Sequence, residues 1–291
     1  MKPAPFEYVR PGSLEEALDV LRQRGDDAKV LAGGQSLVPM MNFRLARPAV
    51  IVDLNGLGDL AYIRPANGAL ALGAMTRQRT IEKSAVVRER APLLAEATPL
   101  IGHLPIRTRG TIGGSLVHAD PAAEYPVVMV ALDAEFTLAR QGGTRRVAAA
   151  DFFETYLTTT IGPDEILTEI RLPGLPQKAA VAFLEISRRH GDFAIVAAAA
   201  VVDLDARGQI AEARIALGGV GPKPVRARAA ERLLAGQRPT AALLAEAARA
   251  VMPETDPPAD IHASAEYRRE MSAVFTRRAL TAALGKLGVA L

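Results

Sequence analysis

The sequence predicts an α+β protein with more than one domain, and three observations support this class. The chain has 291 residues, more than a typical single domain. Short strand-like runs alternate with helical patterns as far as Pro173-Gly-Leu-Pro176, where we expect the domain boundary. Beyond it, three strand-like runs come in series and Ala-rich helices follow. We therefore assign residues 1–174 to one domain, with subdomains at about 1–55 and 56–174, and residues 177–291 to another.

The N-terminal elements end in a loop that carries two adjacent glycines. Ser13-Leu-Glu-Glu16 is a capping box that opens a helix ending near Arg24. Residues 28–31 predict a short strand that leads directly into Ala32-Gly33-Gly34-Gln35-Ser36. Residues 37–45 contain Pro39 and predict at most one broken turn of helix. Residues 48–54 are typical of a buried strand and end at a turn.

The middle of the first domain mixes hairpins with helices. Asn67-Gly68 predicts a hairpin that joins residues 61–64 to residues 69–72. A helix is expected from Thr76 to about Arg90, and a second helical segment follows Pro92. The remaining elements are a buried helix at 125–134, a hairpin over 135–147, a short helix at 151–156 and a strand at 165–172.

The second domain should be an antiparallel meander followed by helices. The strand-like runs cover residues 181–189, 193–204 and 209–220, and turns at 190–192 and 205–208 separate them. The expected helices lie at about 227–235, 240–251 and 264–286.

Composition excludes several classes of protein. The chain has no Cys, which rules out disulfides, thiol catalysis and Cys-bound metal or iron–sulfur centres in it. Its four His residues lie far apart, so we expect no metal site. A net charge of +3, 4% aromatic residues and no Trp disfavour nucleic-acid binding. No signal peptide is recognisable, and no apolar run approaches the roughly 20 residues of a membrane span.

Two Gly-Gly loops flanked by hydroxyl groups are the strongest functional signal. One is Ala32–Ser36, and the other lies at Thr111–Ser115 inside the polar stretch Arg107–Pro126. Glycines let main-chain N–H groups approach a ligand closely, and consecutive N–H groups can form an anion nest. Each loop alone could be an ordinary turn. Together they favour a cofactor with two phosphates or a long polar body, and the spacing is not that of the dinucleotide fingerprint G-x-G-x-x-G.

Other polar residues of this region allow more than one interpretation. His118 lies close to Asp120, which suggests acid–base chemistry. No Ser or Cys nucleophile lies in an elbow motif nearby, which disfavours a catalytic pair, and we expect no catalytic residue. Arg107 and Arg109 could contact phosphate, a partner or an acidic side chain. The turn at 188–193 could be a solvated hairpin end or could place Phe193 over a planar ring.

At these residues the sequence resembles a known family. Residues 32–48, Ala-Gly-Gly-Gln-Ser-Leu-Val-Pro-Met-Met-Asn-Phe-Arg-Leu-Ala-Arg-Pro, are similar to the first FAD motif of molybdenum hydroxylase flavoprotein subunits. Ile101-Gly-His, residues 107–124 and residues 260–269 are similar to further signatures. The medium subunit of aerobic carbon monoxide dehydrogenase, in the wider xanthine dehydrogenase family, is the closest type. The likeness covers nearly the full chain.

The resemblance implies noncovalent FAD in a vanillyl-alcohol-oxidase (PCMH) type fold. Two α+β subdomains would hold FAD between them, and a three-stranded antiparallel sheet with helices would form the C-terminal domain. The two Gly loops would bind the pyrophosphate, Asp120 and Glu124 would reach the ribityl or adenosine end, and Phe193 would lie by the isoalloxazine. Relatives often have Asp at position 124 and Tyr at position 193. The implied cofactor-binding residues are Ala32, Gly33, Gly34, Gln35, Ser36, Ile101, Thr111, Ile112, Gly113, Gly114, Ser115, Asp120, Glu124, Leu167 and Phe193.

The resemblance also implies a function and partners. The chain would be the electron-transfer subunit of a molybdenum hydroxylase, taking electrons from [2Fe-2S] clusters and passing them to an external acceptor. A large subunit would carry the molybdenum cofactor and a small subunit the two clusters, in a dimer of heterotrimers. We expect a cytoplasmic complex, with attachment to the inner face of the membrane as a variant. The alternatives are a self-contained FAD-dependent reductase or oxidase, and a non-enzymatic nucleotide-binding module.

Overall fold

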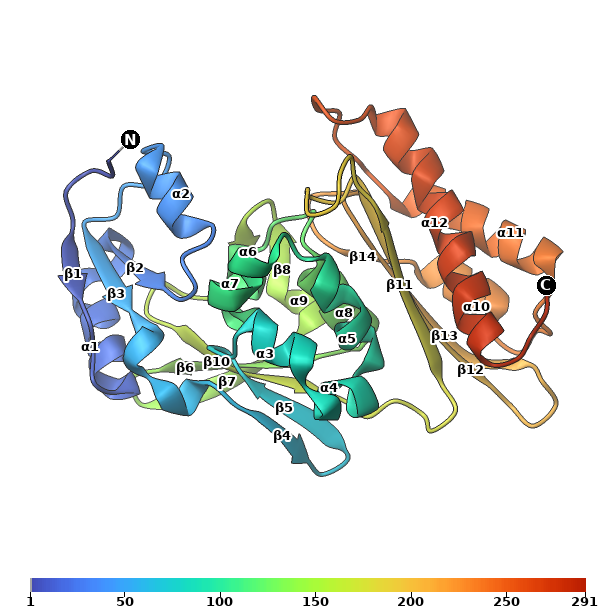
Figure 1. Cartoon of the computed structure of the whole chain (residues 1–291), viewed down its shortest axis with the longest axis horizontal. Helices are drawn as coiled ribbons and strands as arrows, with labels where there is room; N and C mark the ends of the chain where they lie inside the picture. The colour runs from blue at the N-terminus through green and yellow to red at the C-terminus, as the bar shows by residue number, and fades with distance from the viewer. Residues whose placement is uncertain (1) are drawn as a thin grey trace.

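The computed structural model describes residues 2–291 and has a mixed α/β architecture built on three main sheets (Figure 1). The sheets follow one another along the long axis of the molecule, from the N-terminal unit at the left of Figure 1 to the C-terminal unit at the right. The expected α+β class, with a C-terminal unit of antiparallel sheet and helices, is confirmed. The domain boundaries placed from the sequence remain a prediction.

The N-terminal unit is a parallel sheet in the strand order β1-β3-β2, covered by α1. The capping box acts as expected, because Ser13 Oγ accepts a hydrogen bond from the Glu16 N–H at 3.1 Å. Parallel pairing places the ends of β2 and β3 side by side, with Leu31 opposite Asp53. The unit consists of β1 (Glu7–Val9), α1 (Leu14–Arg24), β2 (Ala28–Leu31), α2 (Leu37–Asn42) and β3 (Val50–Asp53).

The middle unit is a five-stranded antiparallel sheet in the order β4-β5-β10-β6-β7, packed against short helices. Its strands are β4 (Ile63–Ala66), β5 (Ala69–Gly73), β6 (Glu135–Arg140), β7 (Gly143–Ala148) and β10 (Ile166–Leu172), beside a small pair formed by β8 (Phe153–Thr155) and β9 (Thr158–Thr159). Its helices are α3 (Gln78–Lys83), α4 (Ala85–Arg90), α5 (Pro92–Ala97), α6 (Leu104–Arg109), α7 (Ile112–His118), α8 (Glu124–Ala131) and α9 (Ala149–Phe152).

The C-terminal unit is an antiparallel sheet with both faces buried. Along β12, Ala197 and Ala199 belong to the core that contains α8, whereas Ala198 and Ala200 belong to the core of the C-terminal helices. Alternating strand residues point to opposite faces, so small side chains let helices approach from both sides. The unit contains β11 (Ala180–Ile186), β12 (Val196–Leu204), β13 (Ile210–Gly218), β14 (Val225–Arg226), α10 (Arg228–Leu234), α11 (Ala241–Ala250) and α12 (Ala265–Lys286).

The structure differs from the sequence-based elements in several places. Residues 37–42 form a regular helix, α2, and not one broken turn, because Pro39 lies in the first turn, where a main-chain N–H is not needed. The pairing of β1 with β3 was not expected, and β14 adds a fourth strand to the predicted three-stranded sheet. The single helix expected from Thr76 to Arg90 is two helices, because Ser84 is extended and its Oγ caps α4 by accepting the Val87 N–H at 3.2 Å. The helix expected at 151–156 is instead the short helix α9, which ends at Phe152, and the chain then forms strand β8.

Replacing the buried carboxylate of Glu231 should strongly destabilise the C-terminal unit. Glu231 accepts the Ile215 N–H at 2.8 Å and forms an ion pair with Arg226, which is largely buried. Glu231→Ala leaves both groups without this acceptor, so we expect the free energy of unfolding to fall by about 3 kcal/mol in urea titrations. Glu246→Ala, at an exposed position of α11, is the control and should change it by less than about 0.5 kcal/mol. Equal losses in the two variants would contradict this.

Candidate cofactor site

The first Gly loop, residues 32–36, follows β2 and presses its main chain against the end of α6. A Cβ placed on Gly33 would lie 2.6 Å from the Arg109 carbonyl oxygen and 2.7 Å from Gly110 Cα. No side chain fits in that space, so a residue larger than Gly would force the two segments apart. Gly34 has a φ of +73°, which also favours glycine.

The second Gly loop is the beginning of α7, and it lies beside the first. A Cβ on Gly114 would be 3.4 Å from Ala32 Cβ and 4.0 Å from the Gly33 nitrogen, so the sequence-predicted pairing of the two loops is geometrically sound. Its N–H groups from Ile112 onward, however, already have protein acceptors: Ile112 donates to the Thr76 carbonyl and Gly113 donates to the Ala74 carbonyl.

The N–H groups of Gly114 and Ser115 are bonded as well. Gly114 donates to Thr111 Oγ1 at 3.1 Å, and Ser115 donates to the Thr111 carbonyl at 3.2 Å. The first loop is different. Within residues 2–291, the N–H groups of residues 33–36 donate to no main-chain or side-chain acceptor. Free donors for an anion are therefore concentrated in the first loop, while the second loop forms its rigid backing.

A cavity of about 330 Å³ opens at the first loop. Its wall combines free N–H groups, an arginine, a carboxylate and apolar side chains, which suits an anion attached to a flat organic body. The lining residues are Leu31, Ala32, Gly33, Gly34, Gln35, Val38, Pro39, Asn42, Asp53, Asn55 and Arg109.

A network of hydrogen bonds at the end of β3 holds the wall of this cavity in place. Asn55 Nδ2 donates to the Ala32 carbonyl at 2.9 Å, and Arg77 NH2 donates to Asn55 Oδ1 at 2.6 Å. Asp53 accepts hydrogen bonds from the Tyr8 hydroxyl at 2.5 Å and from the Asn55 N–H at 2.8 Å. Burial raises the pKa of Asp53, but these hydrogen bonds outweigh burial and lower it below its ordinary value. The carboxylate therefore stays charged beside the loop. Sequence reasoning missed this network.

The remaining predicted cofactor residues lie along two other segments. Ile101 and Leu167 are nearly covered by protein, in the core of the middle unit. Phe193 lies in the loop between β11 and β12 and is 66% exposed, which leaves its ring free to cover a ligand. Gly191 of the same loop packs against the His103 ring, so the loop lies beside the segment that carries Ile101.

Asp120 and Glu124 lie between the two domains assigned from the sequence. Asp120 Oδ1 accepts the Ala122 N–H at 2.9 Å, which shapes the turn before α8. Glu124 is only 5% exposed, so its carboxyl group is almost entirely removed from solvent. Burial, and then the charge of Glu185 on β11, raise the pKa of Glu124 to about 8. At neutral pH Glu124 is therefore protonated and can donate a hydrogen bond to a ligand hydroxyl.

His118 and Asp120 do not form a catalytic pair in this structure. Over residues 2–291, no hydrogen bond joins their side chains, and burial lowers the pKa of His118. In the same part of the chain, no three His, Cys, Asp or Glu side chains are grouped as metal ligands. No helix among these residues is long and apolar enough to span a bilayer.

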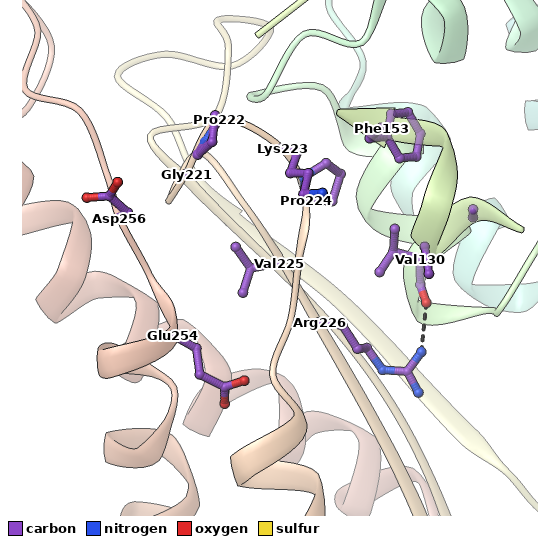
Figure 2. A pocket seen from close by; sticks show the side chains of 12 residues that line it. Val130, Phe153, Gly221, Pro222, Lys223, Pro224, Val225, Arg226, Glu254 and Asp256 are labelled. Carbon is purple, nitrogen blue, oxygen red and sulfur yellow. Dashed lines mark hydrogen bonds between the residues drawn. The ribbon is translucent and has the colours of Figure 1, made fainter. Parts of the chain in front are cut away.

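A second cavity of about 330 Å³ lies at the seam between α8 and the segment that precedes α10, and Figure 2 shows it. Val130, Phe153, Pro222 and Val225 form an apolar part of its wall. Arg226 reaches across the seam and donates to the Val130 carbonyl at 2.8 Å. None of the predicted cofactor residues lines this cavity, so the candidate site is the cavity at the first Gly loop.

The chain matches two sequence models of known families along its length. Residues 4–175 match the family described as "FAD binding domain in molybdopterin dehydrogenase". Residues 181–283 match the family described as "CO dehydrogenase flavoprotein C-terminal domain".

Two characterised relatives and one solved structure resemble nearly the whole chain. The chain is 43% identical to 6-hydroxypseudooxynicotine dehydrogenase complex subunit alpha of Paenarthrobacter nicotinovorans, over 98% of this chain and 96% of that protein. It is 39% identical to caffeine dehydrogenase subunit beta of Pseudomonas sp. (strain CBB1), over 99% and 97% of the two chains. A carbon monoxide dehydrogenase structure from Hydrogenophaga pseudoflava that lacks the Mo-pyranopterin moiety superposes with a TM-score of 0.96 at 38% identity, covering 98% of this chain and 99% of that one.

The buried acid Glu124 should make stability depend on pH. Its folded pKa of about 8 lies above the ordinary 4.5, so the folded state keeps a proton that the unfolded state releases above pH 4.5. The stabilisation is complete below about pH 4.5 and is lost as the pH rises to 8, by at most about 1.4 kcal/mol per pH unit. We expect Glu124→Gln to flatten this decline in urea unfolding between pH 5 and 8.

A second buried acid also contributes to the pH dependence of stability, and an exposed glutamate provides the control. Glu185, with a pKa raised by burial to about 7, should leave a smaller slope in the Glu124→Gln variant. Glu246→Gln, at the exposed position of α11, should decline as the parent does. A Glu124→Gln variant with the parent's slope would show that Glu124 is ionised in the folded protein.

Proposed function

The chain belongs to the family of FAD-binding subunits of molybdenum hydroxylases, and from that premise we propose that it passes electrons from a partner subunit to an external acceptor. Its relatives are subunits of dehydrogenases, and it contains the FAD-binding domain of the family. FAD, when bound, supplies the redox chemistry, since it exchanges one or two electrons at a time. The residues of this chain have to hold FAD, orient it and set its surroundings.

One observation supports this assignment most strongly. The first Gly loop has four N–H groups without acceptors, at residues 33–36, and residues 33–35 line a cavity. The second Gly loop lies directly beside the first. N–H groups held in this way stabilise a negatively charged diphosphate without any reorganisation on binding. In our proposal residues 33–36 donate to the diphosphate of FAD, and residues 111–115 support that loop. From the sequence we expected both loops to donate N–H groups to the diphosphate; in this proposal the first loop donates them and the second loop supports the first.

The other site residues have supporting roles in the proposal. Glu124, protonated at neutral pH, donates a hydrogen bond to a hydroxyl of the cofactor, and Asp120 shapes the turn that presents it. Phe193 covers the flavin ring from the loop between β11 and β12. Ile101 and Leu167 support the cofactor from the core beneath. None of these groups has to transfer a proton, which fits the lack of a His118–Asp120 pair.

The partners are inferred from composition and from the names of the relatives. The chain has no Cys, so it cannot hold an iron–sulfur cluster through thiolates, and those ligands must come from another chain. The relatives are called subunits or medium chains. We therefore propose a large subunit with the molybdenum cofactor and a small subunit with two [2Fe-2S] clusters. The dimer of heterotrimers and the cytoplasmic location stay predictions.

In this proposal a different subunit of the complex determines which substrate is used. Relatives of 36–43% identity carry names that refer to nicotine, caffeine, glyceraldehyde and carbon monoxide, although each matches nearly the full length of this chain. This pattern is expected when the flavin-binding subunit is shared and a different subunit binds the substrate.

The purified full chain, with any chains that co-purify, should show the visible absorption bands of oxidised flavin. Co-expression with neighbouring genes should yield chains that carry molybdenum, iron and acid-labile sulfide. A preparation that stays colourless after incubation with FAD would contradict the FAD assignment. Turnover of an organic substrate by this chain alone would contradict the subunit assignment and favour a self-contained reductase or oxidase.

Gly33→Ala should lower the flavin content while the protein stays folded. The added methyl group would overlap the Arg109 carbonyl, so the loop must move away from its support and its N–H groups lose their fixed direction. We expect the affinity for FAD to fall by about tenfold or more, equivalent to about 1.4 kcal/mol. Gly143→Ala is the control, since a Cβ there meets nothing within 4 Å. A Gly33→Ala protein with full flavin occupancy would refute the placement of the diphosphate.

A further inference from the structure

Arg107 and Arg109 both lie in the last turn of α6, but their guanidinium groups are in different situations. Arg107 is buried, with its Nε 2.9 Å from Glu82 Oε2 and its NH1 2.9 Å from the Ile101 carbonyl oxygen. Arg109 is exposed and lines the cavity at the first Gly loop. In residues 2–291, no carboxylate or other acceptor binds the guanidinium of Arg109. One of two neighbouring arginines is thus structural, and the other has a free cationic group at the cavity.

The main chain of Arg109 is held on two sides. Its carbonyl oxygen accepts a hydrogen bond from Arg77 NH1 and touches the face of Gly33 that has no side chain. The next residue, Gly110, donates its N–H to the Ile106 carbonyl at 2.7 Å and so closes α6. The Arg109 side chain therefore starts from a fixed point directly beside the free N–H groups of the first loop.

The electrostatic surroundings favour an anion at this position. Burial, and then the positive charge of Arg109, lower the pKa of Arg77, while the charge of Asp53 raises it. The guanidinium groups of Arg77 and Arg109 are therefore close enough to repel each other. Asp53 is the carboxylate in the cavity wall, and its oxygens already accept hydrogen bonds from Tyr8 and Asn55. A negatively charged ligand would offset the repulsion and provide acceptors for both the guanidinium and the loop.

We propose that Arg109 is a binding residue for the diphosphate of the dinucleotide, acting together with the N–H groups of residues 33–36. The planar guanidinium can hold two phosphate oxygens at once, which a lysine ammonium cannot do with the same geometry. This inference rests on the proposed function, because it takes the diphosphate of FAD as the ligand. It assigns a specificity role to Arg109: the residue favours flavins that carry a diphosphate over flavins that lack one.

The test compares three probes on the full chain, stripped of flavin and together with any chains that co-purify. FAD, ADP and riboflavin separate the diphosphate from the flavin ring, and titration calorimetry or flavin fluorescence gives each dissociation constant. We expect Arg109→Gln to weaken FAD and ADP by about tenfold or more, as for loss of a charge-assisted hydrogen bond, and to change riboflavin by less than about twofold. Arg109→Lys should be intermediate, and higher salt should weaken FAD more in the parent than in Arg109→Gln.

The control is Arg277→Gln, which removes one exposed positive charge from α12, far along the chain from the cavity. It should leave all three dissociation constants unchanged. Equal weakening of riboflavin and FAD by Arg109→Gln would overturn the proposal, because it would indicate a structural role. Unchanged FAD and ADP affinities would also overturn it. A parent that binds ADP through Arg109 but takes up no FAD would leave the role of Arg109 standing and refute the proposed function.

Discussion

The contact between Gly33 and the Arg109–Gly110 peptide is the constraint on which the site depends. It joins the N-terminal parallel sheet to the helices of the middle unit by main chain against main chain, with no room for a side chain. Asn55 and Arg77 tie the same two segments together, through the Ala32 carbonyl on one side and the Arg109 carbonyl on the other. Because both segments are fixed, the N–H groups of residues 33–36 keep one direction, and a charged ligand can bind without reordering the loop.

Local patterns predicted most of the fold. The Asn67-Gly68 hairpin, the fully buried α8 and the capping box at Ser13 depend on neighbours in the sequence, which the sequence displays directly. The pairing of β1 with β3 was not predictable in this way, because it joins residues 43 positions apart and β1 has only three residues. The break at Ser84 was missed for a related reason: a serine inside a helical pattern can cap a new helix only when its main chain is extended.

The sequence indicated which two loops to compare, but not which of their N–H groups are free. The resemblance named both Gly loops, and their proximity in the structure agrees with that pairing. The sequence could not show that residues 112–115 already donate to protein acceptors, because Thr76 and Ala74 reach them only through tertiary packing. Asp53 and Asn55 did carry a signal. They end a buried strand whose parallel neighbour ends at the first Gly loop, and such strand ends lie together at one edge of a sheet. From the sequence alone, Arg107 and Arg109 had the same candidate roles. In the structure Arg107 is buried and bonded to Glu82, whereas Arg109 lines the cavity.

The central claim is that the first Gly loop, supported by the second, binds the diphosphate of FAD. A structure of the full chain with FAD bound tests it most directly. We expect diphosphate oxygens at about 3 Å from at least two nitrogen atoms of residues 33–36, a normal hydrogen-bond distance. The N–H groups of residues 112–115 should keep their protein acceptors. A diphosphate bound elsewhere, for example in the seam cavity of Figure 2, with the first loop facing only solvent, would contradict the account.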